Sequence, residues 1–319
     1  MSNPAPTEHM KFKITIYAIG RYPFLEISHD EFNRLKNAQK CLSSALAVEE
    51  KYELLLSNYM ELEKEVLGIT VDNMLQRNES YSDFFDIRLK CNRRLINLLT
   101  ATRLYIDQIH RHLRDCMPTE EDAESYTKSL FSEQYDAHFE YRFMEALRNY
   151  SQHRGLAVHT TSLGSSRKQE DESSYLEFNS SIFSLKSELE LDDTFKKSVL
   201  KEMTEKIDLI QCARRYVESL NIVQCLIRDK ISPVASDSRS LIESYLVKYR
   251  EIHTEPVVGV YAMSYLCDEH GEKIVDKVVL LLNWDESRIA LSKMNGKLVN
   301  LHKRYVSSST HNKQKNKAR

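Results

Sequence analysis

The sequence predicts a mainly α-helical protein, an antiparallel helical bundle with small β additions at its N- and C-terminal ends. Apolar residues recur every three or four positions over long stretches between about residues 29 and 232, as on one side of an amphipathic helix. The 319 residues include only seven glycines and six prolines, which suits long helices better than a turn-rich β-sandwich. The clearest strand-like runs lie near the two ends of the chain.

Composition and charge set the class of protein. Hydrophobic residues make up 41% and charged residues 29% of the chain, which is typical of a soluble globular protein. The formal net charge of −2 excludes the global basic field of a dedicated duplex-DNA binder. No apolar window approaches about 18 residues, so we expect a cytoplasmic protein that does not enter a membrane.

The cysteines are too scattered to indicate a disulfide framework or a zinc site. Closely spaced pairs are typical of both, and none occurs here. The pattern therefore predicts reduced structural thiols and no metal ligands, at Cys41, Cys91, Cys116, Cys212, Cys225 and Cys267.

Elements in the first half of the chain follow from local patterns. An unstructured lead over 1–10 precedes a run with strand-like alternation, and Ser28 or Asp30 can cap the first helix. Gly68 is a plausible terminator of that helix, and Pro118 separates the second helix from the third. The expected elements are a strand at 11–19 and helices at about 31–68, 80–116 and 120–154.

The second half alternates loops, helices and strands. Residues 160–174 are rich in Ser, Lys and acids and read as a loop, whereas 175–185 reads as extended chain. Pro233 is expected to break a long helix, and Asp268–Gly271 resembles a hairpin turn. The further expected elements are helices at 194–206, 208–231 and 237–253 and strands at 257–265 and 274–282.

These elements divide the chain into four regions. We expect an N-terminal lead and strand at 1–28, a helical bundle at 29–232, a C-terminal helix plus a small β region at 233–302, and a basic disordered tail at 303–319.

The six residues from Arg148 to His153 contain the pattern most suggestive of chemistry. At about 100° per residue, a helix places Glu145, Arg148, Asn149, Gln152 and His153 within an arc of roughly 140°. Upstream, His138 and Arg142 extend this polar stripe. The apolar residues expected to face the bundle core on the other side are Phe139, Phe143, Leu147 and Tyr150.

This set of side chains suits cleavage of RNA. A histidine titrates near neutral pH, so His153 could withdraw the proton of a ribose 2′-OH. The Arg148 guanidinium could stabilise charge on the phosphate oxygens, with Asn149 orienting the substrate and Glu145 holding Arg148 in place. No metal or other cofactor is required. One histidine leaves an acid–base partner missing, which a symmetric dimer would supply.

A solvent-exposed polar helix face explains the same residues without any function, and an arginine and a histidine arise at this spacing by chance. The segment nevertheless resembles the HEPN superfamily, whose motif is an arginine, usually a polar residue, and a histidine after four to six intervening positions. Arg148, Asn149 and His153 fit that pattern, and the helical surroundings at 29–232 are similar to the HEPN bundle.

The resemblance implies a homodimeric, metal-independent endoribonuclease with Arg148 and His153 as catalytic residues and Asn149 in support. It also implies a toxin-like or anti-phage role and an antitoxin or other regulatory protein as a partner. Gln152, Arg142, His138 and His159 are the candidate RNA-binding residues, and His159 alternatively is a loop histidine beyond the helix. The alternative function is a non-catalytic helical interaction or RNA-binding module.

Overall fold

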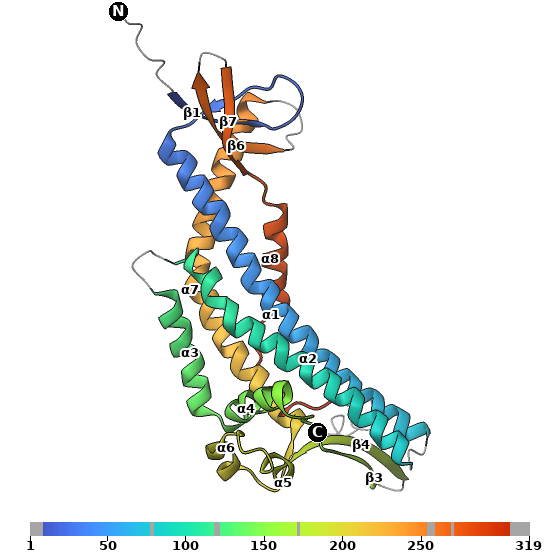
Figure 1. Cartoon of the computed structure of the whole chain (residues 1–319). Helices are drawn as coiled ribbons and strands as arrows, with labels where there is room; N and C mark the ends of the chain where they lie inside the picture. Colours follow the sequence, from blue (N-terminus) through green and yellow to red (C-terminus); the bar gives the residue numbers. More distant parts are fainter. Residues whose placement is uncertain are drawn as a thin grey trace, which may run out of the picture. The chain divides into compact units, whose positions relative to one another are not determined.

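The computed structural model describes residues 9–76, 80–117, 122–170, 173–253, 259–268 and 271–306. Helices dominate these residues, which confirms the mainly α prediction (Figure 1). The long helices are α1 (His29–Leu75), α2 (Tyr81–Arg114) and α7 (Leu209–Ile252). The shorter ones are α3 (Ala123–Ala137), α4 (Phe139–His153), α5 (Lys186–Leu189), α6 (Lys197–Glu202), α8 (Asn283–Met294) and a 3-10 turn at Leu301–Lys303.

Antiparallel strands form two sheets. One has the order β2-β1-β6-β7 and the other the order β3-β4-β5. Their bounds are β1 (His9–Ile16), β2 (Leu25–Glu26), β3 (Thr160–Glu170), β4 (Ser173–Leu185), β5 (Lys206–Asp208), β6 (Val260–Asp268) and β7 (Gly271–Val279).

The chain forms two compact units, each assembled from three separate segments. Unit 1 comprises 1–60, 97–133 and 223–296, and unit 2 comprises 61–96, 134–222 and 297–319. The helices α1, α2 and α7 each contribute residues to both units. The lead at 1–8 and the tail from 307 lie outside the described residues.

In unit 1, three helices pack around buried tyrosines and a buried ion pair. The Tyr52 ring of α1 lies 5.9 Å from the Tyr105 ring of α2, and the Tyr105 hydroxyl donates to Gln224 Oε1 of α7 at 2.8 Å. Arg228 of α7 binds both carboxylate oxygens of Glu49 on α1, at 2.8 and 2.5 Å. The Glu49 side chain is only 3% exposed, so Arg228 neutralises a carboxylate that water cannot solvate.

The helix α7 passes through Pro233 without ending, which corrects the predicted break and the separate helix at 237–253. A proline costs an interior helix about 3 kcal/mol because one N–H bond is lost. Burial of a continuous stripe on both sides of Pro233 offsets this cost, since Ile227, Ile231, Ala235, Ile242, Tyr245 and Tyr249 are all buried. The predicted region boundary at 232/233 therefore falls inside a helix.

The four-stranded sheet of unit 1 joins the two ends of the chain. Strand β1 pairs with β6 in a register that places Ile14 opposite Ala262, and both side chains are buried. The strands predicted near both termini are thus present, and they belong to one sheet. Lys13 reaches across it to Glu272 of β7 at 2.8 Å.

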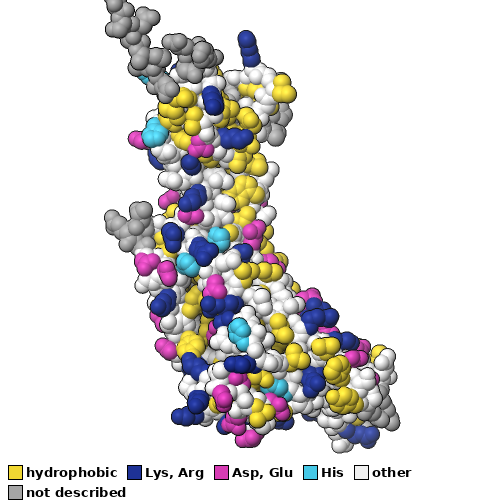
Figure 2. All heavy atoms as spheres, in the orientation of Figure 1, with side chains coloured by type: hydrophobic (Ala, Val, Ile, Leu, Met, Phe, Trp, Pro, Cys, Tyr) yellow, Lys and Arg dark blue, Asp and Glu magenta, His cyan; other side chains and the backbone are white. Residues whose placement is uncertain are grey.

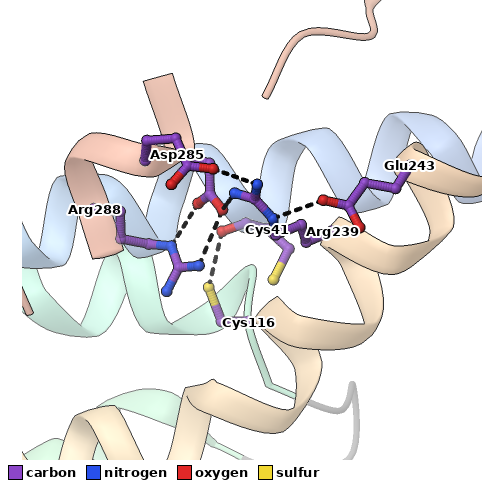
Figure 3. Close-up of polar contacts among 7 residues, drawn as sticks. Cys41, Cys116, Arg239, Glu243, Asp285 and Arg288 are labelled. Carbon is purple, nitrogen blue, oxygen red and sulfur yellow. Dashed lines mark hydrogen bonds and ion pairs between the residues drawn. The ribbon is translucent and has the colours of Figure 1, made fainter. Parts of the chain in front are cut away.

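Helix α8, which the sequence patterns did not predict, is held by a buried carboxylate. Arg239 Nη1 of α7 lies 2.7 Å from Asp285 Oδ2, and Arg288 Nε lies 2.5 Å from Asp285 Oδ1 (Figure 3). Burial alone would raise the pKa of Asp285, but the hydrogen bonds from the two arginines hold the pKa below its usual value. Beside this cluster, the Cys116 thiol donates to the Cys41 carbonyl at 3.3 Å.

The sheet of unit 2 corrects the prediction of a loop at 160–174. Strand β3 pairs with β4 from Thr160 opposite Phe183 to Glu170 opposite Ser173. Serine and threonine suit exposed strand positions, and the pairing with β4 satisfies backbone groups that local composition cannot report. This sheet lies in the middle of the chain, so the strands are more than small additions at its ends.

Residues 297–306, here called the C-terminal strap, are the last described segment of unit 2. The backbone N–H of Asn300 donates to Glu218 Oε1 of α7 at 3.0 Å, and His302 Nδ1 lies 2.7 Å from Glu218 Oε2. Arg214 of α7 ion-pairs with Glu63 of α1 and donates to the Arg304 carbonyl at 2.7 Å. The strap therefore adds polar partners to Glu218 and Arg214 of α7.

Candidate functional site

The Arg148–His153 segment forms the last turns of α4 in unit 2. The helix ends because the backbone N–H groups of Arg154 and Gly155 both donate to the Tyr150 carbonyl, at 2.8 and 3.2 Å. A Cβ at Gly155 would lie 2.7 Å from the Tyr150 hydroxyl oxygen, so any larger residue here would displace the end of the Tyr150 side chain. The sequence places the motif correctly at a helix terminus followed by Arg154 and Gly155.

The sequence predicted one long helix over 120–154, whereas the structure has two helices there, and α4 is the second of them. The chain is extended at His138, with φ −127° and ψ 122°, so α3 ends at Ala137 and α4 begins at Phe139. Arg142 stabilises this break, because its Nη1 donates to the Tyr135 and Asp136 carbonyls, both at 2.9 Å. The polar stripe therefore does not continue along a single helix from His138 into α4.

The polar and packed sides of α4 are less separate than the sequence pattern indicates. Phe143 and Leu147 are buried as predicted, but Tyr141 and Met144 are buried as well. Met144 lies four positions and Tyr141 seven positions before Arg148, on the same side of the helix. Arg148 thus continues the buried side of α4 near the C-terminal end of this helix, and its side chain is half-buried.

Arg148 has an unusual environment for a half-buried cation. Its Nη1 donates to Gln152 Oε1 at 2.9 Å, and its buried Nε has no hydrogen-bond partner among the residues that the structure describes. Among the described residues no carboxylate forms an ion pair with it. By contrast, the half-buried Arg94 of the same unit pairs with Glu65 at 2.9 Å. A guanidinium shielded from water without a counter-ion is a favourable position for an anion.

The neighbouring motif residues are open to solvent. Asn149, Gln152 and His153 are all exposed. Within the described part of the chain, no hydrogen bond or ion pair engages the His153 side chain, and none joins it to Arg148. Both ring nitrogens of His153 therefore remain available to a ligand or to a second protein chain.

Two predicted site residues, Glu145 and Arg142, have structural partners instead, and a third, His138, is part-buried. Glu145 accepts a hydrogen bond from the buried Tyr216 hydroxyl of α7, so it does not hold Arg148 as expected. Arg142 donates to Glu202 at 2.7 Å in addition to its two carbonyl contacts. Burial and the nearby Arg215 lower the pKa of His138.

His159 lies beyond α4, and its ring orientation is fixed. The Leu185 backbone N–H donates to its Nδ1 at 2.9 Å, with the Ser184 hydroxyl 3.2 Å from the same atom. Nδ1 therefore carries a lone pair, and the proton of the neutral ring lies on Nε2. Burial lowers the pKa of His159, which favours this neutral form.

Sequence patterns missed the residues that position His159 and surround it. The buried Asn92 of α2 binds the Val158 backbone on both sides, accepting its N–H at 2.9 Å and donating to its carbonyl at 3.1 Å. A pocket of about 160 Å³ lies alongside, lined by Tyr81, Phe84, Phe85, Arg88, His159, Thr160 and Thr161. The only local signal in the sequence was that α2 begins with more aromatic residues than one core-facing side of a helix can accommodate.

Surface and metal properties add little that is specific. Figure 2 shows basic and acidic side chains mixed over the visible face, in keeping with the net charge of −2. No cluster of three potential metal ligands occurs within the described ranges, and no described helix is long and apolar enough to cross a bilayer. The described residues, which include all six cysteines, contain no disulfide, and burial raises the pKa of Cys91 to about 12.

Comparisons with known proteins give no further guide to the site. No family model, curated protein or solved structure matches this chain.

Proposed function

We propose that this protein is a metal-independent endoribonuclease that acts as a homodimer through the C-terminal end of α4. The observation that carries the proposal is the half-buried Arg148 guanidinium, which has no carboxylate partner among the described residues and whose Nε is unsatisfied. An RNA phosphate would supply the missing negative charge and hydrogen-bond acceptors.

The proposed reaction is a transesterification within RNA. His153 accepts the proton of the ribose 2′-OH, and the 2′-oxygen forms a bond to phosphorus while the bond to the 5′-oxygen breaks. Arg148 stabilises the charge on the non-bridging oxygens in the transition state. The products are a 2′,3′-cyclic phosphate and a 5′-hydroxyl, whose proton comes from a general acid.

A second copy of the chain is proposed to supply that acid. His153 is exposed and unengaged, so a two-fold axis near the end of α4 would bring a second histidine to the same phosphate. Asn149, also exposed on this turn, is available to orient the ribose or the phosphate.

Incubation of RNA with the purified protein in EDTA tests this proposal. The wild type should release 2′,3′-cyclic phosphate ends, whereas Arg148→Ala and His153→Ala should each lower the rate at least about 100-fold. The matched control is Arg103→Ala, because Arg103 is an exposed arginine in an i,i+4 pair with Asp107. No cleavage by the wild-type dimer, or equal cleavage by all variants, would overturn the proposal.

The HEPN resemblance extends the proposal to a toxin-like or anti-phage role under control of an antitoxin. Expression in bacterial cells should then slow growth, and Arg148→Ala should remove the effect. Unchanged growth inhibition by Arg148→Ala would separate any toxicity from the proposed cleavage.

A non-catalytic interaction module is the second candidate. It is favoured by the exposed apolar side chains near the end of α1 and the start of α2, which include Met74, Leu75, Tyr81 and Phe85. RNA or protein binding without cleavage, unaffected by His153→Ala, would support this candidate over the enzyme.

A further inference from the structure

The pocket beside His159 combines two cationic or polar donors with an aromatic wall. Arg88 lies on one turn of α2 with Phe84 and Phe85, while His159 directly precedes β3 and Thr160 and Thr161 are its first residues. No acidic side chain lines it among the described residues. The acids of the same turn, Asp83 and Asp86, line a separate hollow.

Arg88 is available to bind an anion. Among the described residues, the one hydrogen bond of its guanidinium runs from Nη1 to the His159 carbonyl at 3.5 Å, and the guanidinium lies 5.9 Å from the centre of the Phe85 ring. No carboxylate pairs with Arg88 in the part of the chain that the structure describes. A half-buried arginine held only by a carbonyl and a ring retains most of its donors for a phosphate.

The other polar groups of the pocket are donors too. The His159 ring proton lies on Nε2 because Nδ1 accepts from Leu185, and this buried Nε2–H has no acceptor in the described part of the chain. The Thr160 and Thr161 hydroxyls likewise have no hydrogen-bond partner within the described ranges. Donors thus outnumber acceptors around the pocket, which suits the acceptor oxygens of a phosphate or a sugar phosphate.

The aromatic residues are too exposed to be explained by core packing. Tyr81 is 83% exposed, Phe85 45% and Phe84 37%. Their rings offer flat surfaces at the rim of a pocket that is too small for a whole nucleotide. Stacking on such rings is the usual way in which single-stranded nucleic acid places its bases.

Tyr150 connects this pocket to the candidate catalytic turn. Its ring, which comes from α4, packs edge-on against the His159 ring with 6.0 Å between the centres. Tyr150 lies between Arg148 and His153 in the sequence. Through this ring contact, the pocket adjoins the turn of α4 at which the RNA is proposed to bind.

We propose that this pocket is a nucleotide-binding subsite for single-stranded RNA, with the phosphate at Arg88 and His159 and the base against Tyr81 and Phe84. The inference rests on the proposed function for its choice of RNA, but it assigns binding to residues outside the Arg148–His153 motif. It also gives His159 the role of a fixed donor, not of a base.

Fluorescence anisotropy with a labelled 2′-O-methyl octanucleotide tests the subsite, because this probe lacks the 2′-OH that cleavage requires. Arg88→Ala and Tyr81→Ala should each weaken binding roughly 10-fold, and Arg88→Ala should lower the slope of log affinity against log salt by about one. Arg93→Ala, an exposed arginine on the same helix, is the matched control and should change affinity less than about twofold.

Competition experiments identify the ligand. Uridine 5′-monophosphate should displace the probe at lower concentration than inorganic phosphate, and equal potency of the two would overturn the role of the base. Unchanged affinity in Arg88→Ala and Tyr81→Ala, or equal loss in Arg93→Ala, would overturn the subsite. A Tyr81→Ala change that alters only the monomer–dimer equilibrium would instead assign the aromatic rim to self-association.

The cleavage assay separates this inference from the proposed function. Binding that depends on Arg88 without any cleavage would contradict the endoribonuclease and support the subsite. Cleavage that depends on Arg148, together with unchanged binding and cleavage in Arg88→Ala, would support the enzyme and overturn the subsite.

Discussion

Arg148 Nη1 donates a hydrogen bond to Gln152 Oε1 over 2.9 Å, so the guanidinium is oriented by a neutral amide one turn further along α4. A neutral partner fixes the direction of the cation without neutralising it. This pair is the reason to treat the end of α4 as an anion site and not as an ordinary salt-bridged surface.

A charge introduced at this amide should therefore inhibit the proposed reaction. In Gln152→Glu, the new carboxylate would compete with the RNA phosphate for Arg148, and we expect kcat/KM to fall at least about 10-fold. Gln211→Glu adds the same charge at an exposed position on α7 and should have little effect. Full activity in Gln152→Glu would show that Arg148 does not contact the phosphate.

The tight contact that ends α4 predicts a coupled pair of substitutions. A Cβ in Gly155→Ala would lie 2.7 Å from the Tyr150 hydroxyl oxygen, and we expect a loss of about 1–3 kcal/mol in the free energy of unfolding. Tyr150→Phe removes that oxygen, so the double variant should recover part of the loss in urea denaturation. Additive losses in the double-mutant cycle would contradict this explanation.

The fixed ring of His159 predicts how stability depends on pH. Because burial lowers the pKa of His159 in the folded state, the unfolded chain binds its proton more readily. The stabilising contribution of the neutral ring is therefore complete above the unfolded-state pKa of about 6.5 and is lost as the pH falls below it. We expect the free energy of unfolding to decrease between pH 7 and pH 5.

His159→Asn provides the comparison for that measurement. Asparagine keeps an acceptor for the Leu185 N–H but cannot take up a proton, so the variant should show a shallower decrease over the same pH range. Burial also lowers the pKa of His112 and His138, so some dependence on pH should persist. Identical slopes for the two proteins would contradict the role assigned to His159.

Sequence patterns predicted the parts of the fold that depend on local periodicity. The helix over 81–114 and the strands near both termini could be predicted because their apolar side chains recur with the period of a helix or of a strand. Pro233 and His138 were misjudged for opposite reasons. Around Pro233 the buried stripe is strong enough to continue a helix, whereas at His138 the Arg142 contacts with two carbonyls stabilise an extended residue within an apparently helical pattern.

The candidate site was only partly accessible to sequence reasoning. Helix geometry placed Asn149, Gln152 and His153 together at the surface, and the structure places them on the last turns of α4. Helix geometry could not predict that Glu145 accepts a hydrogen bond from Tyr216, because Tyr216 lies far away in the sequence. The same limit hid the pocket at Arg88, which lies near the point where Asn92 binds the Val158 backbone to α2.

The C-terminal segments also have a consequence for synthesis in the cell. Strand β1 is synthesised long before its neighbour β6, which begins only at Val260, and Glu218 of α7 is made before the strap that binds it. Neither unit can reach its final contacts until these later segments have left the ribosome. Products truncated before β6 would lack the partners that complete both units.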